Sequence, residues 1–142
     1  MRIYIAGSMF FAKEFVKTKE VLERMGFIAD FAPDTYECIN NPELNLNENL
    51  EHCERMDIMR ACFEIQEKCD SLIVLNYKKE DLEGYIGVNS LIEMGLAYYL
   101  RQKIFLLYPP PNKEKARYYT EVMLMKPIIL NGKLENIMNY LD

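Results

Sequence analysis

A single carboxylate in an apolar stretch is the first residue of this sequence that could do chemistry. Glu93 lies in the run 91–100, just after a loop that contains Gly84 and Gly87. Glycines at this spacing favour a tight loop, because glycine tolerates backbone angles that other residues avoid. A carboxylate near a helix N-terminus is stabilised by the helix dipole. It can attack an anomeric carbon or bind sugar hydroxyls, so this stretch predicts a ligand site.

The same stretch also has a purely structural explanation. Asn89 or Ser90 can cap the following helix, which is apolar almost all round and therefore expected to be buried. Ser90 and Glu93 have the spacing of a capping box, in which the glutamate side chain returns to the serine amide. That arrangement needs no ligand. The two roles can also alternate, with Glu93 capping the helix while the site is empty.

A second candidate site follows the first apolar run of the chain, at Gly7, Ser8 and Met9. Where a helix begins, free backbone amides and the helix dipole can hold an anion, and the Ser8 hydroxyl adds a donor. Ser8 could equally serve only as a helix cap. Neither the G-x-G-x-x-G nor the P-loop pattern is present, so the sequence does not favour a dinucleotide-binding or ATP-hydrolysing protein.

Further side chains could complete a site. Tyrosine rings could stack on a base or orient a carboxylate, although they serve as often in packing; the candidates are Tyr4, Tyr77 and Tyr85. Two lysines, Lys78 and Lys79, could meet a phosphate or only water. The candidates for a second acid are Asp57, Asp70 and Asp81, of which Asp70 is better explained as the turn into a strand.

Apolar runs and helical periodicity predict the elements that must position these residues. Strands are expected at about 2–6, 27–31, 71–76, 103–108 and 127–130. Helices are expected at about 8–25, 50–68, 91–100, 112–125 and 134–141. Residues 32–48 are dense in Asn, Asp, Glu and Pro and are expected to form a long surface loop, at most with a short helical turn.

Alternating strands and helices predict an α/β fold, a flavodoxin/Rossmann-like three-layer sandwich with a five-stranded parallel sheet in the order 2-1-3-4-5. Residues 1–142 suffice for a single domain. In such sheets ligands bind beyond the carboxyl ends of the strands, at the switch point between strands 1 and 3. Substrate contacts are therefore expected from Gly7, Ser8, Met9, Asn76, Lys78, Gly84, Tyr85, Gly87, Asn89 and Ser90.

Composition limits the partners. The formal net charge of -5 argues against a nucleic acid as the main ligand, although a small phosphate needs only local donors. No apolar run approaches the roughly 20 residues of a membrane span, and the N-terminus does not resemble a signal peptide, so a cytoplasmic protein is expected. The cysteines, at 38, 53, 62 and 69, and the lone His52 lack zinc-ligand spacing, so no metal is expected.

Several motifs together resemble the nucleoside 2-deoxyribosyltransferase-like superfamily. They are the opening I-Y-I-A-G-S, the aspartate before the third strand, and the glycine loop that leads to E-M-G-L-A. The motifs are most similar to an uncharacterised branch related to deoxynucleoside 5′-phosphate N-glycosidases. The resemblance implies cleavage or transfer at the N-glycosidic bond of a nucleoside or nucleoside 5′-monophosphate, without a cofactor. It also implies a homodimer or higher homo-oligomer, because family sites are often completed by a neighbouring subunit.

The resemblance assigns roles to individual residues. Glu93 matches the family nucleophile, Tyr4 lies near the first-strand aromatic residue, and Ser8 lies near a phosphate-binding serine. Where transferases carry aspartates, this sequence has Gly87 and Cys62. Asp57, about one helical turn from Cys62, is a possible substitute.

Two hypotheses stay open. One is an N-glycosidase or nucleoside deoxyribosyltransferase that uses Glu93. The other is a non-catalytic nucleotide-binding module on the same fold, which the missing acids favour.

Overall fold

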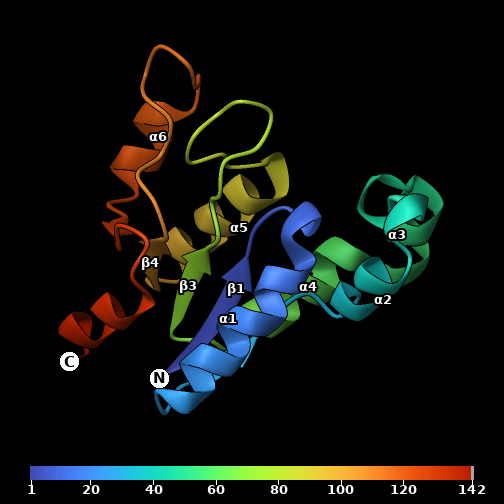
Figure 1. Cartoon of the computed structure of the whole chain (residues 1–142), viewed down its shortest axis with the longest axis horizontal. Helices are drawn as coiled ribbons and strands as arrows, with labels where there is room; N and C mark the ends of the chain where they lie inside the picture. The colour runs from blue at the N-terminus through green and yellow to red at the C-terminus, as the bar shows by residue number, and fades with distance from the viewer. Residues whose placement is uncertain (142) are drawn as a thin grey trace.

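A five-stranded sheet forms the centre of the protein (Figure 1). The computed structural model describes residues 1–141. The strand order is β2-β1-β3-β4-β5 and every neighbouring pair is parallel, which confirms the predicted fold class and order. The strands are shorter than predicted: β1 (Arg2–Ala6), β2 (Ile28–Asp30), β3 (Ser71–Val74), β4 (Lys103–Leu106) and β5 (Ile128–Ile129).

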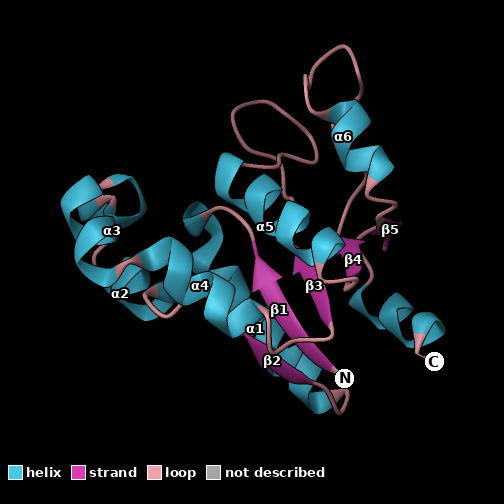
Figure 2. Ribbon diagram, turned by 180° about the vertical axis from the view of Figure 1, so that it is seen from behind, coloured by secondary structure: helices cyan, strands magenta, loops and turns pink. Residues whose placement is uncertain are grey.

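Helices cover both faces of the sheet (Figures 1 and 2). One face packs against α1 (Ala12–Arg24), which a 3-10 turn η1 (Met9–Phe11) precedes, and against the terminal 3-10 helix η4 (Leu134–Tyr140). The other face packs against α4 (Ile58–Gln66), α5 (Val88–Tyr99) and α6 (Tyr119–Leu124). Among the described residues, no helix is long and apolar enough to cross a membrane.

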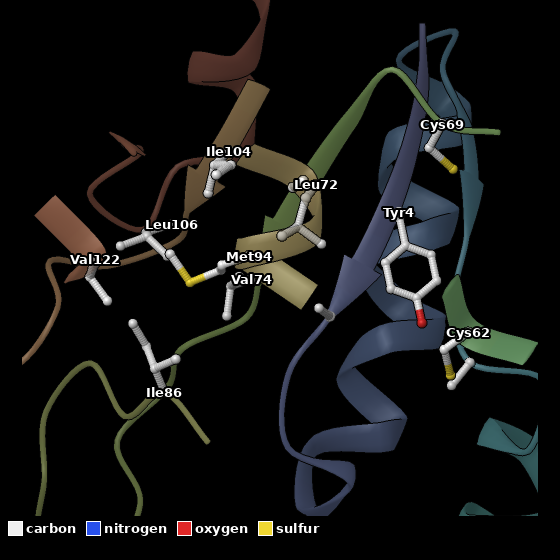
Figure 3. Close-up of a cluster of buried hydrophobic side chains, with 13 residues drawn as sticks. Tyr4, Cys62, Cys69, Leu72, Val74, Ile86, Met94, Ile104, Leu106 and Val122 are labelled. Atoms are coloured by element: carbon white, nitrogen blue, oxygen red, sulfur yellow. The ribbon is translucent and has the colours of Figure 1, made fainter. Parts of the chain in front are cut away.

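The alternation of side chains along the central strands builds two separate cores. In β1, Ile3 and Ile5 point to the α1 face, whereas Tyr4 and Ala6 point to the α4–α5 face. This follows from the two-residue period of a strand, and β3 repeats the pattern. Figure 3 shows the second core, in which Met94 of α5 lies among side chains of β3 and β4. Helix α5, which carries Glu93, therefore packs on the same face of the sheet as Tyr4.

The segment 32–48 is more regular than predicted. It contains a helix α2 (Thr35–Asn40) and two 3-10 turns, η2 (Pro42–Leu44) and η3 (Leu46–Glu48). Thr35 and Cys38 are buried, so this segment packs against the rest of the protein and is not a simple surface loop. In both views α2 lies with the next helix, α3, beyond the end of α4.

The prediction of a single helix at 50–68 was wrong. The chain forms α3 (Leu50–Met56) and α4, which Asp57 separates in a left-handed conformation with φ 44°. Such a conformation interrupts the helix because a right-handed helix cannot pass through it. In α3, Leu50 is exposed and His52 is buried.

Two later helices also differ from prediction. Helix α6 is much shorter than the span 112–125, because Asn112 caps only a local turn by accepting a hydrogen bond from the Lys115 amide. Helix α5 begins at Val88, and it is not buried all round, since Val88 and Tyr99 are strongly exposed. One face of α5 packs on the sheet and the other is open.

The loop between β3 and α5 is fixed to the end of β4 by Asn76. The fully buried Asn76 amide donates to the Tyr108 carbonyl (2.7 Å) and accepts from the Tyr108 amide (2.9 Å). It also donates to the Gly84 carbonyl (3.4 Å). Gly84 has φ +71° and passes so close to Pro109 that a Cβ atom there would lie 2.0 Å from the Pro109 carbonyl oxygen. Asn76 and Gly84 therefore have structural roles.

We expect Gly84→Ala to lower the free energy of unfolding by about 3 kcal/mol, because the methyl group would both overlap Pro109 and strain a left-handed residue. Gly95→Ala is the matched control: a Cβ atom there meets nothing within 4 Å, and alanine should stabilise the helix by up to about 1 kcal/mol. Urea unfolding of both variants measures the difference. Similar effects for the two variants would contradict the close approach at Gly84.

Candidate active site

A cavity of about 380 Å³ lies at the carboxyl ends of the central strands. Its walls come from the loops after β1 and β2, from α4, and from the N-terminal part of α5. This is the position predicted from the strand order, next to the switch point between β1 and β3.

Most of the residues predicted to contact substrate line this cavity. They are Gly7, Ser8, Met9, Tyr85, Gly87, Asn89, Ser90 and Glu93. Five predicted residues do not line it. Asn76 and Gly84 anchor the neighbouring loop, Lys78 and Asp57 lie on the surface, and Tyr4 lies in the core.

The two surface residues have partners of their own. Lys78 pairs with Glu83 at 3.7 Å, and both side chains are exposed. Asp57 pairs with Arg60 at 3.0 Å, also in an exposed position. The structure therefore brings neither of them to the cavity, and Asp57 gains no geometric support as a second acid.

Glu93 is free of the capping role that its sequence spacing suggested. Helix α5 has Gly87 as its N-cap and no side-chain cap hydrogen bond, so Ser90 lies inside the helix and Glu93 in its second turn. The capping-box explanation is therefore wrong. The Glu93 side chain is partly buried and lines the cavity. Burial disfavours its charged form and raises its pKa to about 8.

A buried glutamine on α4 binds the backbone of α5 at Glu93. Gln66, at the end of α4, donates from Nε2 to the Glu93 carbonyl (2.8 Å). Gln102 in turn donates to the carbonyls of Gln66 (2.7 Å) and Cys69 (2.9 Å). These bonds join α4, α5 and the turn before β4. They fix the depth of Glu93 in the cavity.

Tyr4 lies beneath the cavity and is almost fully buried, at 1% exposure. It is hydrogen-bonded to Cys62, and Figure 3 shows its hydroxyl pointing toward that residue. Burial and the nearby Glu93 raise the Tyr4 pKa, so its hydroxyl remains protonated. Burial likewise raises the pKa of the Cys62 thiol to about 12. Both groups are neutral, and only Cys62 of the two lines the cavity.

Ser8 and Lys79 form a positive corner of the cavity. The Lys79 ammonium donates to Ser8 Oγ (3.0 Å) and lies over the Tyr85 ring at 5.1 Å and the Phe10 ring at 5.7 Å. Ser8 Oγ also accepts from the Phe10 amide, at 3.3 Å, so the serine caps η1 as well. A cation and a hydroxyl at a helix start are suited to an anionic group.

Two functional candidates escaped the sequence analysis. Asp34, after β2, lines the cavity, and its Oδ2 lies 3.0 Å from Nε2 of His52 on α3. Their side chains are each only 3% exposed. The sequence offered a lone histidine and an aspartate, but nothing linked them because the segment between them was expected to be an irregular loop.

Two further expectations concern a metal ion and a second copy of the chain. Within residues 1–141 no group of three or more His, Cys, Asp or Glu side chains is placed to hold a metal ion. A homo-oligomer stays a prediction. The apolar residues Val88 and Ile92 line the cavity and are exposed.

Comparison with known proteins gives a likeness of fold. No family model matches the sequence, and no curated protein matches it. A solved structure, that of the CMP N-glycosidase BcmB from Clostridium botulinum, is similar with a TM-score of 0.54 and 19% sequence identity. The similarity covers 99% of this chain and 100% of that chain. The whole chain therefore shares the α/β architecture of that enzyme.

The raised pKa of Glu93 predicts a pH-dependent cost to stability. Between the ordinary value of 4.5 and about 8, the folded protein binds a proton that the unfolded chain has lost, so stability falls as pH rises through this range. Glu93→Gln cannot ionise and should escape this fall. We expect its free energy of unfolding to gain on that of the wild type by roughly 4 kcal/mol between pH 4.5 and 8.5.

Urea unfolding at several pH values measures this difference. Comparing the two proteins at each pH removes the contribution of all other titrating groups. Parallel stability curves would show that Glu93 ionises as readily in the folded protein as in the unfolded chain.

Proposed function

We propose that the protein cleaves the N-glycosidic bond of a nucleoside 5′-monophosphate, with Glu93 as the nucleophile. The position of Glu93 carries the proposal. It lies in a cavity at the carboxyl edge of the sheet and has no capping role. A carboxylate so placed is suited to attack on an anomeric carbon.

The reaction proceeds in two steps. An ionised Glu93 oxygen attacks the anomeric carbon, the bond to the base nitrogen breaks, and the base leaves with the electron pair and takes up a proton. A glycosyl ester on Glu93 results. Water then attacks the same carbon, the ester bond to Glu93 breaks, and the sugar 5-phosphate, a proton and the free carboxylate result. Attack by a second base in place of water would give a new nucleoside 5′-monophosphate, a proton and the same carboxylate.

The positive corner supports a phosphorylated substrate. Lys79 and Ser8 present a charge and a hydroxyl on the same side of the cavity, and no acidic side chain is paired with Lys79 among the salt bridges of the described residues. A phosphate bound there would receive charge-assisted hydrogen bonds. With the 5′-phosphate at this corner, the sugar would extend toward Glu93.

The fold comparison supports the same bond type. The similar solved structure is named as a CMP N-glycosidase, which acts on a nucleoside 5′-monophosphate by cleaving its glycosidic bond. The residues of this cavity are compatible with that chemistry.

A binding module is the second candidate function, and one observation favours it. Nucleophilic attack needs the ionised form of Glu93, which the pKa of about 8 makes the minor form at pH 7. Gly87 and Cys62, both lining the cavity, supply no acid for the leaving base. A protein that only binds nucleotides would need neither an ionised Glu93 nor an acid to protonate the leaving base.

Glu93→Gln should reduce base release from nucleoside 5′-monophosphates by at least about 1000-fold, because the amide cannot form the glycosyl ester. The assay is chromatographic detection of free base with a panel of nucleosides and nucleotides. Glu83→Gln, an exposed neighbour, is the matched control and should keep full activity. Equal activity of the wild type and Glu93→Gln would exclude Glu93 as the nucleophile. No release by the wild type, together with a rise in Tm on adding nucleotide, would favour the binding module.

Lys79→Met should lower kcat/KM for nucleoside 5′-monophosphates by about 10- to 100-fold, because a charge-assisted contact to the phosphate is lost. The corresponding nucleosides should be affected less than threefold. Lys78→Met changes the adjacent but exposed lysine, and it should alter neither substrate class. An equal loss for nucleosides and nucleotides in Lys79→Met would place the lysine away from the phosphate.

A further inference from the structure

One buried pair at the cavity is not used in the proposed reaction. Asp34 Oδ2 lies 3.0 Å from His52 Nε2, and Cys38 Sγ lies 3.8 Å from the same oxygen. Burial is nearly complete, at 2% exposure for Asp34 and 3% for His52. These contacts hold the carboxyl group of Asp34 in one orientation.

The second carboxyl oxygen of Asp34 is not satisfied by the protein. Oδ1 is buried and has no hydrogen-bond partner in the described chain, while Asp34 itself lines the cavity. An unpaired carboxylate oxygen in a buried position is costly, since the lost hydration is not replaced. The arrangement is suited to a donor that arrives with a ligand.

The strand order shows which part of the ligand would reach Asp34. Asp34 follows β2 and Lys79 follows β3, and these strands lie on opposite sides of β1. Asp34 and Glu93 line the same cavity, together with Cys62 of α4. A ligand with its phosphate at Lys79 and its anomeric carbon at Glu93 would direct its base toward Asp34.

The apolar part of the cavity wall is suited to a flat ring. Ala32, Ile58, Cys62 and Phe63 are apolar or neutral and line the same space as Asp34. Such walls bind a heterocycle through its faces and leave its polar edge to a single acceptor.

We propose that Asp34, oriented by His52, accepts a hydrogen bond from the exocyclic amine of the nucleobase. The protein therefore selects bases with an amine, cytosine or adenine, over their keto counterparts, uracil or hypoxanthine. The inference rests on the proposed function for the placement of the phosphate and the sugar. Asp34 is a specificity residue in this scheme, and His52 is a positioning residue.

Asp34→Asn tests the proposal because it puts a donor in place of the unpaired acceptor Oδ1. The new amide can keep its oxygen toward His52 Nε2 and place its NH2 group at the position of Oδ1. Binding of CMP, UMP, AMP and IMP is measured by calorimetry in the Glu93→Gln background, where no substrate is consumed. We expect Glu93→Gln to bind CMP over UMP and AMP over IMP by at least about 10-fold. Adding Asp34→Asn should abolish or reverse both preferences.

Controls separate this role from general effects. Glu48→Gln changes another carboxylate that lines the cavity, but an exposed one, and should leave the preferences unchanged. His52→Gln keeps Asp34 and weakens its orientation, so it should reduce the preferences even if Asp34→Asn does not fold.

Two outcomes would overturn the proposal. One is equal weakening of all four nucleotides by Asp34→Asn, which would place Asp34 on the sugar. The other is that the base preferences stay unchanged in Asp34→Asn, or in His52→Gln where Asp34→Asn does not fold. A preference for amine-bearing bases without any base release by the wild-type protein would defeat the cleavage reaction and leave this inference standing.

Discussion

Glu93 is held in the wall of the cavity because α5 is fixed along its buried side. The Gln66 side chain binds the Glu93 carbonyl, and Met94 and Ala97 are fully buried against the sheet. A carboxyl group in this position loses hydration that no described side chain replaces, and the raised pKa is the consequence. The burial of the neighbouring residues thus places a costly carboxyl group in the wall of the cavity.

The floor of the cavity follows from the same frame. Tyr4 and Cys62 lie between the sheet and α4, and both remain neutral because burial disfavours their charged forms. A neutral floor beneath two carboxyl groups avoids further repulsion between like charges. It also means that neither group can supply a negative charge or readily accept a proton. Chemistry at this site must therefore come from Glu93, from the groups around the rim, or from the substrate.

The sequence allowed the fold to be predicted because the evidence for it is local. Apolar runs, helical periods and turn residues identify β1, α1, β3 and β4, and the handedness of crossovers restricts their order. The same reasoning placed Ser8 and Glu93 near the carboxyl edge of the sheet, because Ser8 closely follows β1 and Glu93 lies near the start of α5. It failed at Asp57, because a left-handed conformation at a non-glycine residue has no reliable sequence pattern. It also misassigned Ser90, since the true start of α5 at Gly87 depends on how the preceding loop packs.

Contacts between distant residues could not be predicted in the same way. Asn76 and Lys78 follow the end of β3 as closely as Lys79 does, yet only Lys79 lines the cavity. Which of them does so depends on the path of the loop, which the hydrogen bonds between Asn76 and Tyr108 determine. The pairing of Asp34 with His52 depends on the folding of the whole segment between them. Neither residue carries a local signal for its partner.

The pair of Asp34 and His52 has a further consequence for the chain that it encloses. The two residues are 18 positions apart, so their contact closes a loop that contains α2, η2 and η3. Closing a flexible loop of this length costs roughly 2–3 kcal/mol of chain entropy, apart from a constant term. Asn47 and Glu48 belong to this loop and also line the cavity. A ligand that bound to Asp34 would also restrict the loop, and the order of one wall of the cavity would then be thermodynamically linked to its occupancy.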